Sequence, residues 1–303
     1  MKIFLTGASG FIGGYLTPIL KKEHEVVVLK SDLLDLDAVA QEVQNCNPDI
    51  IVHLAARTEV EKSFYEQTSF SEVNYIGSVN LIEAAKKCSN LKNFVFASTM
   101  EVYGWQPISD LIKNKQPFEH VAFDEYTQPN PNAPYAVAKY AVEKYLEYMK
   151  RSQGFPFTAI RQTNAYGRKD NNFFVTEQII TQMLNNPAEI NLGYREPYRN
   201  FIFVEDLLDA WQVVINNPDN AQGKIFTIGP DQPIQIQKHA EYIANQLGWS
   251  GKINWNTKPH RPGEIFWLNS NHQLITDTLG WKPQCTYEHG IAKTIDLWRG
   301  KTL

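Results

Sequence analysis

The chain has 303 residues, of which 43% are hydrophobic and 20% are charged, and its formal net charge is −4. These values are typical of a globular protein with a sizeable core, and they exclude broad electrostatic attraction to nucleic acid, whose phosphates are bound by many Lys and Arg side chains. No apolar run approaches the roughly 20 residues that a membrane span requires, so we expect neither nucleic acid nor a membrane as a partner.

Short apolar runs rich in β-branched residues alternate along the chain with stretches of helical period. The expected strands cover residues 2–6, 26–29, 50–55, 94–98, 158–162 and 224–228. Alternation of this kind builds a parallel sheet with helices on both faces. The predicted fold class is therefore α/β, a Rossmann-type doubly wound parallel sheet with a smaller C-terminal α/β lobe. We expect the sheet domain to comprise residues 1–162 plus about 201–229, and the lobe about 163–200 plus 230–303.

A glycine-rich turn follows the first expected strand and leads into a helix. Glycine permits the tight turn and the close approach of the backbone to a ligand, and the helix N-terminus offers free N–H groups and a positive dipole end to a pyrophosphate. Between a strand and a helix, this spacing indicates a dinucleotide cofactor held by the sheet domain, which leaves the lobe for the substrate. The predicted contacts are Gly7, Ser9, Gly10, Phe11, Ile12 and Gly13.

A later helix carries the sequence Tyr135-Ala136-Val137-Ala138-Lys139. Residues four apart share a helix face, so the Lys139 ammonium is expected near the Tyr135 phenol, where it favours the ionised form. A phenol with an ordinary pKa of about 10 is a weak base at neutral pH, and a nearby cation lowers that pKa toward the working range. The pair therefore predicts a site of proton transfer.

These motifs resemble the extended short-chain dehydrogenase/reductase family, also called the NAD-dependent epimerase/dehydratase family, and the resemblance spreads over nearly the whole chain. It implies that Tyr135 exchanges a proton with a sugar hydroxyl, that Thr99 hydrogen-bonds the same hydroxyl, and that Lys139 also holds the nicotinamide ribose. It implies further cofactor contacts at or after strand ends, namely Asp32, Leu33, Leu54, Ala55, Ala56 and Ser98.

Three later segments resemble the family's contacts to a nucleotide-diphosphate sugar, which is the implied substrate. Asn164 stands in a stretch that resembles R-P-x-N-x-Y-G, although Gln162 replaces the usual Pro. Arg199 begins a stretch that resembles R-D-F-I-x-V-x-D, and Arg261 begins one that resembles R-P-G-D/E. Two arginines suit a diphosphate because a guanidinium pairs bidentately with phosphate oxygens.

The segment Ser98-Thr99-Met100-Glu101-Val102-Tyr103-Gly104 bears on the reaction. It resembles the 4,6-dehydratase pattern S-T-D/S-E-V-Y-G, in which the Glu removes the C5 proton, so Glu101 favours chemistry at C5 beside hydride transfer at C4. Met100 weakens dehydration, because it stands where the dTDP-glucose dehydratases have an acidic Asp and a thioether donates no proton. The resemblance implies an NAD(P)-dependent nucleotide-sugar epimerase/dehydratase. The alternatives are an NAD(P)H-dependent NDP-4-keto-6-deoxysugar reductase and a non-catalytic NAD(P)-binding scaffold.

The connection after the second strand leaves the choice between NAD and NADP open. Residues 26–29 run almost directly into Lys30-Ser31-Asp32, a compression similar to that of the 4-keto-6-deoxysugar reductases. No acidic residue closes that strand to bind a ribose 2′-hydroxyl, and Lys30 with Ser31 can receive a 2′-phosphate instead. An epimerase or a dehydratase would bind its cofactor tightly, since it regenerates the cofactor within each turnover.

The remaining expectations concern assembly and location. Dimerisation through the helix of Tyr135 is common among such relatives, and the apolar positions Val142, Tyr145 and Met149 permit it, so we expect a homodimer. Residues 104–134 form a long connection with little periodicity, either a lid over the substrate or a surface excursion. Three widely spaced cysteines fit reduced thiols, and seven histidines show no metal-site spacing. The first residues enter a strand at once, which predicts no targeting peptide and a cytoplasmic location.

Overall fold

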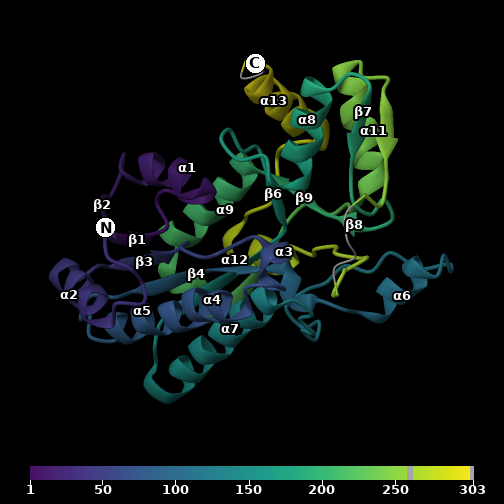
Figure 1. The fold of residues 1–303 in the computed structure, drawn as a ribbon. Coiled ribbons are helices and arrows are strands. Elements are labelled where there is room, and N and C mark those ends of the chain that lie inside the picture. The colour runs from purple at the N-terminus through teal and green to yellow at the C-terminus, as the bar shows by residue number, and fades with distance from the viewer. Residues whose placement is uncertain (258–261, 301–303) are drawn as a thin grey trace.

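The structure is a computed structural model that describes residues 1–257 and 262–300. Its central sheet consists of β1 (Lys2–Thr6), β2 (Glu25–Val28), β3 (Ile50–His53), β4 (Asn93–Thr99), β5 (Phe157–Gln162) and β10 (Lys224–Ile228). The six strands lie in the order β10-β5-β4-β3-β1-β2, and all neighbours are parallel (Figure 1). The predicted α/β fold class with a parallel sheet is thereby confirmed.

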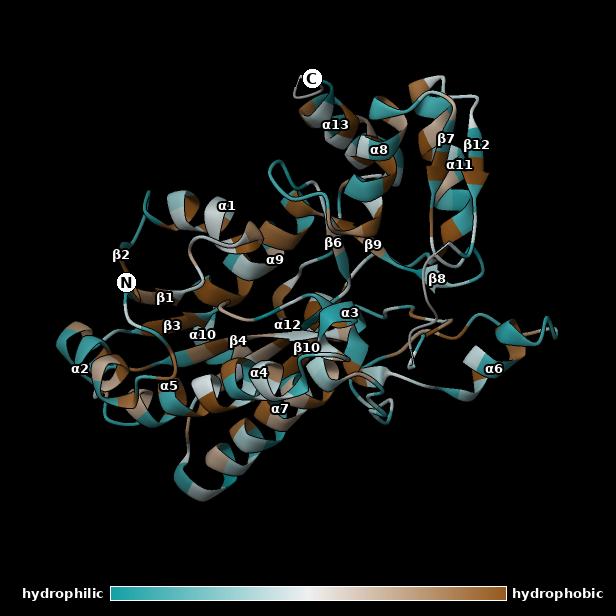
Figure 2. Cartoon of the chain, in the orientation of Figure 1, coloured by the Kyte–Doolittle hydropathy of each residue, from teal (hydrophilic) through white to brown (hydrophobic). Residues whose placement is uncertain are grey.

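Helices cover both faces of this sheet (Figure 1). They are α2 (Leu36–Cys46), α5 (Gly77–Ala85) and α7 (Pro134–Gln153) on one face, and α1 (Phe11–Leu20) and α9 (Val204–Asn216) on the other. Alternate strand residues serve the two faces, because side chains of a strand point to opposite sides. Ile3 and Leu5 join the core under α1 and α9, whereas Phe4 joins the core under α2, α5 and α7. Figure 2 shows the inner strands in brown, the colour of hydrophobic residues.

A second group of elements, which we call the C-terminal lobe, lies to one side of the sheet (Figure 1). It consists of β6 (Asn164–Tyr166), α8 (Val175–Asn185), β7 (Glu189–Asn191), β8 (Tyr198–Arg199), β9 (Phe201–Phe203), β11 (Ile234–Gln235), α11 (Ile236–Leu247), β12 (Lys252–Asn254) and α13 (Tyr287–Arg299). Its strands pair in twos, β6 with β9, β8 with β11 and β7 with β12. The division of the chain into two domains at the predicted boundaries stays a prediction.

Short helical elements complete the fold. They are α3 (Val60–Ser63), α4 (Gln67–Ser71), the π-helical turn η1 (Glu72–Ile76), the 3-10 turn η2 (Met100–Tyr103), α6 (Pro107–Lys113), α10 (Pro218–Ala221) and α12 (Gln273–Leu279). Helix α6 belongs to the long connection 104–134, where the sequence pattern gave no helix. Ile108, Ile112 and Phe123 of that connection are buried in one cluster with Trp267, so this segment packs against the C-terminal part of the chain.

The strand order fixes where a ligand crevice forms. The chain places β2 on one side of β1 and then returns to place β3 on the other side, so the order reverses between β1 and β3. In open α/β sheets, ligands bind beyond the carboxyl ends of the strands at such a switch point. The glycine-rich loop after β1 and the loop after β3 therefore border the expected cofactor crevice.

Helix α7 packs more deeply than its sequence suggests. Val142 and Met149 are buried in the core of the protomer, and the hydroxyl of half-buried Tyr145 donates to Glu83 at 2.6 Å. The expectation that Val142 and Met149 contribute to a dimer surface is therefore wrong, because the sheet and α5 already cover that side of the helix. The homodimer itself stays a prediction.

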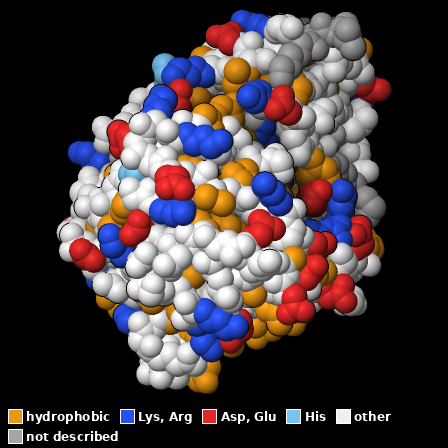
Figure 3. Space-filling model, turned by 90° about the vertical axis from the view of Figure 1, so that its left-hand side faces the viewer, with side chains coloured by type: hydrophobic (Ala, Val, Ile, Leu, Met, Phe, Trp, Pro, Cys, Tyr) orange, Lys and Arg blue, Asp and Glu red, His pale blue; other side chains and the backbone are white. Residues whose placement is uncertain are grey.

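The surface carries charges of both signs, and the cysteines are unpaired. Figure 3 shows Lys and Arg side chains interspersed with Asp and Glu on one face of the molecule. Cys46, Cys88 and Cys285 are free thiols. Within residues 1–257 and 262–300, no helix is both long and apolar enough to cross a bilayer, and no three His, Cys, Asp or Glu side chains gather where they could hold a metal ion.

Two fully buried histidines make the stability of the fold sensitive to acid. Burial lowers the pKa of His53 and of His239 to about 3, whereas the unfolded chain takes up these protons near pH 6.5. The unfolded state therefore binds more protons below about pH 6.5, and stability falls as the pH drops from there toward about 3, by about 2 kcal/mol per histidine at pH 5.

His239→Gln tests this expectation. The amide keeps a polar group between Thr176 and Tyr287, which contact the two ring nitrogens at 3.0 and 2.7 Å. The loss of unfolding free energy between about pH 7.5 and pH 5, measured by urea denaturation, should shrink by about 2 kcal/mol in the variant. An equal loss in both proteins would contradict the assignment.

Candidate active site

A cavity of about 470 Å³ opens at the switch point of the sheet. It brings together side chains and backbone from the first strand to the C-terminal lobe. The predicted site residues that line it are Gly7, Ser9, Gly10, Phe11, Ile12, Gly13, Leu54, Ala55, Ala56, Ser98, Thr99, Glu101, Tyr135, Lys139 and Asn164. Most of the predicted cofactor and catalytic residues therefore face one cavity.

The glycine-rich loop packs backbone against backbone at two of its glycines. A Cβ on Gly7 would lie 2.6 Å from the nitrogen of Ala55, and a Cβ on Gly13 would lie 2.1 Å from the oxygen of Gly7. Gly7 also has a φ of +76°, in the left-handed region that favours glycine. Gly10 precedes α1 in an extended conformation and provides no side-chain cap. The first amides of α1 therefore stay available to an anion such as a pyrophosphate.

A chain of buried hydrogen bonds connects β1, β3 and α5 next to the glycine-rich loop. The Ser78 hydroxyl donates to the Asn74 carbonyl at 2.6 Å, so it accepts from Nε2 of His53 at 2.8 Å. Nδ1 of His53 then accepts from the Thr6 hydroxyl at 2.7 Å, and the Thr6 oxygen accepts the Ala55 amide at 3.2 Å. Nε2 of His53 therefore carries a hydrogen and Nδ1 carries none, so the imidazole is neutral. The lowered pKa of His53 agrees with this assignment.

Helix α7 presents three buried polar side chains on one face, at intervals of four residues. They are Tyr135, Lys139 and Glu143. The Lys139 ammonium donates to the carbonyl of Ala97 at 2.9 Å and lies 4.7 Å from the ring centre of Phe96. The predicted pairing of Tyr and Lys on one helix face is present, and the strand end at Ala97 fixes the position of the lysine.

The electrostatics of this pair differ from the prediction. Burial raises the pKa of Tyr135 above its usual value of 10, the Glu101 carboxylate raises it further, and a hydrogen bond to Thr99 opposes both effects. Burial also lowers the pKa of Lys139 to about 7. The prediction that Lys139 lowers the pKa of Tyr135 is therefore not met, because burial raises the pKa of the phenol and also lowers the pKa of the lysine.

A second cavity of about 190 Å³ adjoins the first and shares Glu101 and Asn164 with it. Arg199 lines this second cavity, is buried, and donates to the Glu264 carboxylate at 3.0 Å. A diphosphate here would meet a guanidinium that is already held in place by a carboxylate. The third predicted substrate residue, Arg261, lies outside the described residues.

Three predicted cofactor residues do not line either cavity. The backbone amide of exposed Lys30 donates to the Glu42 carboxylate at 3.0 Å, and the Ser31 amide donates to the same group at 2.9 Å. Asp32 accepts the Leu34 amide at 2.9 Å and so stabilises a turn. Leu33 is buried in the core against α5. Lys30, Asp32 and Leu33 thus shape the end of β2 without facing the described cavities.

Met100 lies away from both cavities, whereas Arg168 lines the first one. Met100 is buried in the cluster around Trp267 and lines neither cavity, so position 100 brings no group to the site. Arg168 lines the first cavity although the sequence patterns did not single it out. It directly follows the Asn164–Gly167 stretch, and that adjacency is the one signal that the sequence offered.

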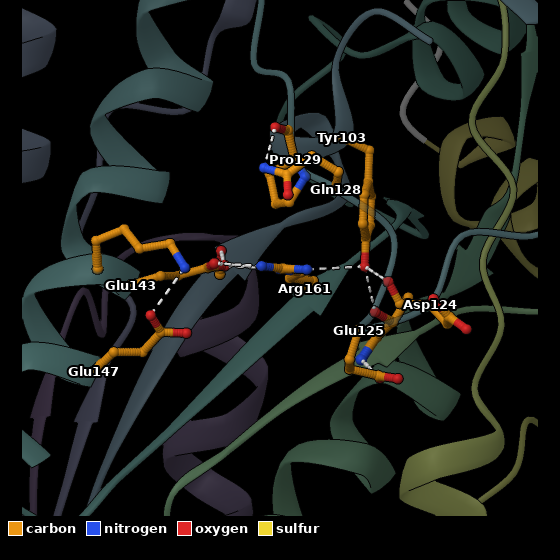
Figure 4. A network of polar contacts seen from close by, with 11 residues as sticks. Tyr103, Asp124, Glu125, Gln128, Pro129, Glu143, Glu147 and Arg161 are labelled. Carbon is orange, nitrogen blue, oxygen red and sulfur yellow. Dashed lines mark hydrogen bonds and ion pairs between the residues drawn. The ribbon is translucent and has the colours of Figure 1, made fainter. Parts of the chain in front are cut away.

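A buried polar network lies behind the site (Figure 4). Arg161 on β5 donates to the Glu143 carboxylate at 3.0 and 2.7 Å and to the Tyr103 hydroxyl at 3.0 Å. Ser98 at the end of β4 donates to the same carboxylate. The Tyr103 hydroxyl in turn donates to the carbonyl of Asp124 at 2.6 Å. The network therefore ties the helix of Tyr135 to two strand ends and to the 104–134 connection.

Comparison with known proteins shows the family of the chain. Residues 3–229 match the NAD dependent epimerase/dehydratase family. The chain is 26% identical to dTDP-D-glucose 4,6-dehydratase of Dictyostelium discoideum over 98% of its own length and 81% of that protein.

Solved structures share the fold. The chain matches the UDP-glucose 4-epimerase of Thermotoga maritima, solved with UDP-glucose, with a TM-score of 0.88 and 24% identity over 99% of both chains. It matches RMD of Pseudomonas aeruginosa, complexed with NADPH, with a TM-score of 0.83 and 23% identity over 99% of both chains. With the family match over residues 3–229, the chain belongs to the NAD dependent epimerase/dehydratase family.

Proposed function

We propose that this protein catalyses hydride transfer at C4 of a nucleotide-diphosphate sugar, with a nicotinamide dinucleotide as cofactor and Tyr135 as acid/base. The observation that carries the proposal is the meeting of two cavities at Glu101 and Asn164. The glycine-rich loop and Tyr135 line the larger cavity, and Arg199 lines the smaller one. A ligand anchored through its phosphates beside Arg199 can therefore present a sugar carbon to the larger cavity.

The proposed roles follow from chemistry at this junction. When bound, the nicotinamide supplies and takes up the hydride. Tyr135 takes the proton of the C4 hydroxyl as C4 becomes a ketone, and returns it when the ketone is reduced. Thr99 hydrogen-bonds that oxygen, and Lys139 holds the ribose and, when protonated, favours the phenolate. Glu101 lines both cavities, and its proposed role is to remove a proton at C5, which a C4 ketone makes acidic.

Heavy-water experiments separate the possible outcomes. The protein is incubated with a panel of nucleotide-diphosphate hexoses in heavy water, and the products are followed by NMR. Inversion at C4 without solvent deuterium would identify a 4-epimerase, whereas deuterium at C5 or C6 would support Glu101 as a base and dehydration. Since position 100 brings no acid to the site, we expect elimination to be the weaker activity. No turnover of any hexose or of its 4-keto derivative would overturn the proposal.

A 4-keto-sugar reductase is the second candidate function. The short connection between the end of β2 at Val28 and the start of α2 at Leu36 favours it, because it resembles that of the 4-keto-6-deoxysugar reductases. Cofactor turnover discriminates the two. A reductase oxidises one NAD(P)H per product, whereas an epimerase or dehydratase regenerates its cofactor.

We also propose that the cofactor is NAD. The Glu42 carboxylate accepts hydrogen bonds from the backbone amides of Lys30 and Ser31, just after β2. This is where a Rossmann fold binds the adenosine ribose. A carboxylate there accepts a hydrogen bond from a 2′-hydroxyl and repels a 2′-phosphate.

Glu42→Gln should therefore shift affinity toward NADPH by about fivefold relative to NADH, which corresponds to about 1 kcal/mol for one partly exposed charge. Fluorescence titration of both cofactors measures the ratio. Asp37→Asn, which removes a charge from an exposed position of the same helix, is the matched control. Tighter binding of NADPH than of NADH by the unmodified protein would contradict the proposal.

Two further properties are proposed. Unpaired thiols at all three cysteines fit the reducing cytoplasm. A homodimer would use the exposed outer face of α7, where Val137 and Tyr148 are about half exposed. Sedimentation of the purified protein tests the dimer.

A further inference from the structure

Arg168 lies in the loop from β6 to α8, where the C-terminal lobe meets the glycine-rich loop. Its guanidinium carbon is 4.2 Å from the ring centre of Phe11 and 3.8 Å from that of Phe174. The planar cation is held between one ring at the start of α1 and one ring just before α8. Only 8% of Arg168 is exposed, and cation–π contacts are stronger where water is excluded.

The charge of Arg168 is only partly compensated within the protein. Its partner Glu177 lies 3.5 Å from Nη1, which is longer than a charge-assisted hydrogen bond of about 2.7–2.9 Å. The other oxygen of Glu177 accepts the amides of Gly167 and Arg168 at 2.9 and 3.0 Å. Nη1 also donates to the carbonyl of Ala165, while Nε is buried without a hydrogen-bond partner. A ligand that accepts a hydrogen bond from Nε would therefore be bound more tightly, because it removes the free-energy cost of an unsatisfied buried donor.

The surroundings indicate what that ligand is. Arg168 lines the same cavity as Gly10 and Phe11, and the uncapped start of α1 attracts an anion there with a partial charge of about one half. Among the described residues that line this cavity, the other Lys or Arg is Lys139, which is held at the carbonyl of Ala97 beside Tyr135. Arg199 lines the neighbouring cavity. An anion bound beside the glycine-rich loop would therefore be neutralised by the guanidinium of Arg168.

We propose that Arg168 binds the pyrophosphate of the dinucleotide cofactor and thereby links the C-terminal lobe to the glycine-rich loop. The role rests on the proposed dependence on a nicotinamide dinucleotide. A guanidinium presents paired N–H groups to phosphate oxygens, and the two aromatic rings hold its plane in one orientation. Arg168 and Arg199 then serve different phosphates, those of the cofactor and those of the sugar nucleotide.

The test measures cofactor affinity and needs no sugar substrate. Arg168→Gln should weaken NADH binding roughly 10- to 100-fold, the range of a hydrogen bond to a charged group, as measured by fluorescence titration. ADP-ribose, which has the pyrophosphate but no nicotinamide, should lose the same factor in calorimetry. Arg151→Gln, at an exposed position in the last turn of α7, is the matched control and should bind both ligands as the unmodified protein does. Weakening of NADH alone would overturn the pyrophosphate contact.

A second variant covers the case in which the single change disturbs the fold by leaving Glu177 buried without its countercharge. Arg168→Gln/Glu177→Gln is neutral and keeps an oxygen to accept the two loop amides, and it should bind NADH as weakly as Arg168→Gln. Glu177→Gln alone keeps the guanidinium and should bind NADH at least as tightly as the unmodified protein. Unchanged affinity in the double variant would overturn the role of Arg168 and leave the proposed function standing. An unmodified protein that binds neither NADH nor NADPH would overturn both.

Discussion

Tyr135→Phe is expected to lower kcat about 100- to 10,000-fold, the usual contribution of a positioned acid/base group, with cofactor affinity nearly unchanged. Tyr135 is buried, with 8% of the residue exposed, and it lines the cavity beside Thr99. Its hydroxyl is the group lost in the variant, and the phenylalanine ring fills the same space. Product formation from the hexose nucleotide identified by NMR measures kcat, and NADH titration measures affinity.

Tyr65→Phe is the matched control, because Tyr65 is 74% exposed and lines neither cavity. Its kcat should equal that of the unmodified protein. Retained turnover in Tyr135→Phe would show that another group transfers the proton. Glu101 would be tested first, because it lines both cavities. The scaffold interpretation, in which the fold binds a cofactor without catalysis, requires no turnover by the unmodified protein at all.

The sheet and the glycine-rich loop could be predicted because local pattern and tertiary role agree there. The six expected strands contain the runs of β-branched and apolar residues that a sheet covered on both faces requires, and they differ from the observed bounds by at most two residues. Gly7 and Gly13 are glycine for a reason that is visible in the structure, since a Cβ at either position would collide with backbone. Tyr135 and Lys139 share a helix face by spacing alone.

The remaining features depend on contacts between distant segments. Arg168 follows a loop glycine and looks like a solvated cation, and only the meeting of Phe11 with Phe174 around it reveals a buried site. Val142 and Met149 fit a dimer surface and a protein core equally well by pattern, and the packing of α7 on the sheet decides for the core. The lowered pKa of Lys139 likewise follows from its burial in the folded chain, which the i, i+4 spacing does not contain.

Glu143 is another residue whose role depends on contacts between distant segments of the chain. Its loss should have the largest effect on the free energy of unfolding. It is fully buried on α7, and its carboxylate accepts three hydrogen bonds from the Arg161 guanidinium (Figure 4). Glu143→Leu leaves that guanidinium buried without a countercharge. We expect the free energy of unfolding to fall by about 3–5 kcal/mol, the usual effect of removing one partner of a buried pair. Guanidinium chloride denaturation followed by circular dichroism measures the loss.

Two companion variants separate the buried charge from the mere loss of a carboxylate. Glu147→Gln lies one turn further along α7, where the Glu147–Lys144 pair is 2.9 Å long and partly exposed, so it should change the free energy of unfolding by less than about 1 kcal/mol. Glu143→Leu/Arg161→Met removes both charges and should recover most of the stability, because apolar side chains of similar size can replace a buried pair. A double variant as unstable as Glu143→Leu would mean that the bonds from Arg161 to Tyr103 and from Ser98 to Glu143, rather than the stranded charge, hold α7 against the strand ends.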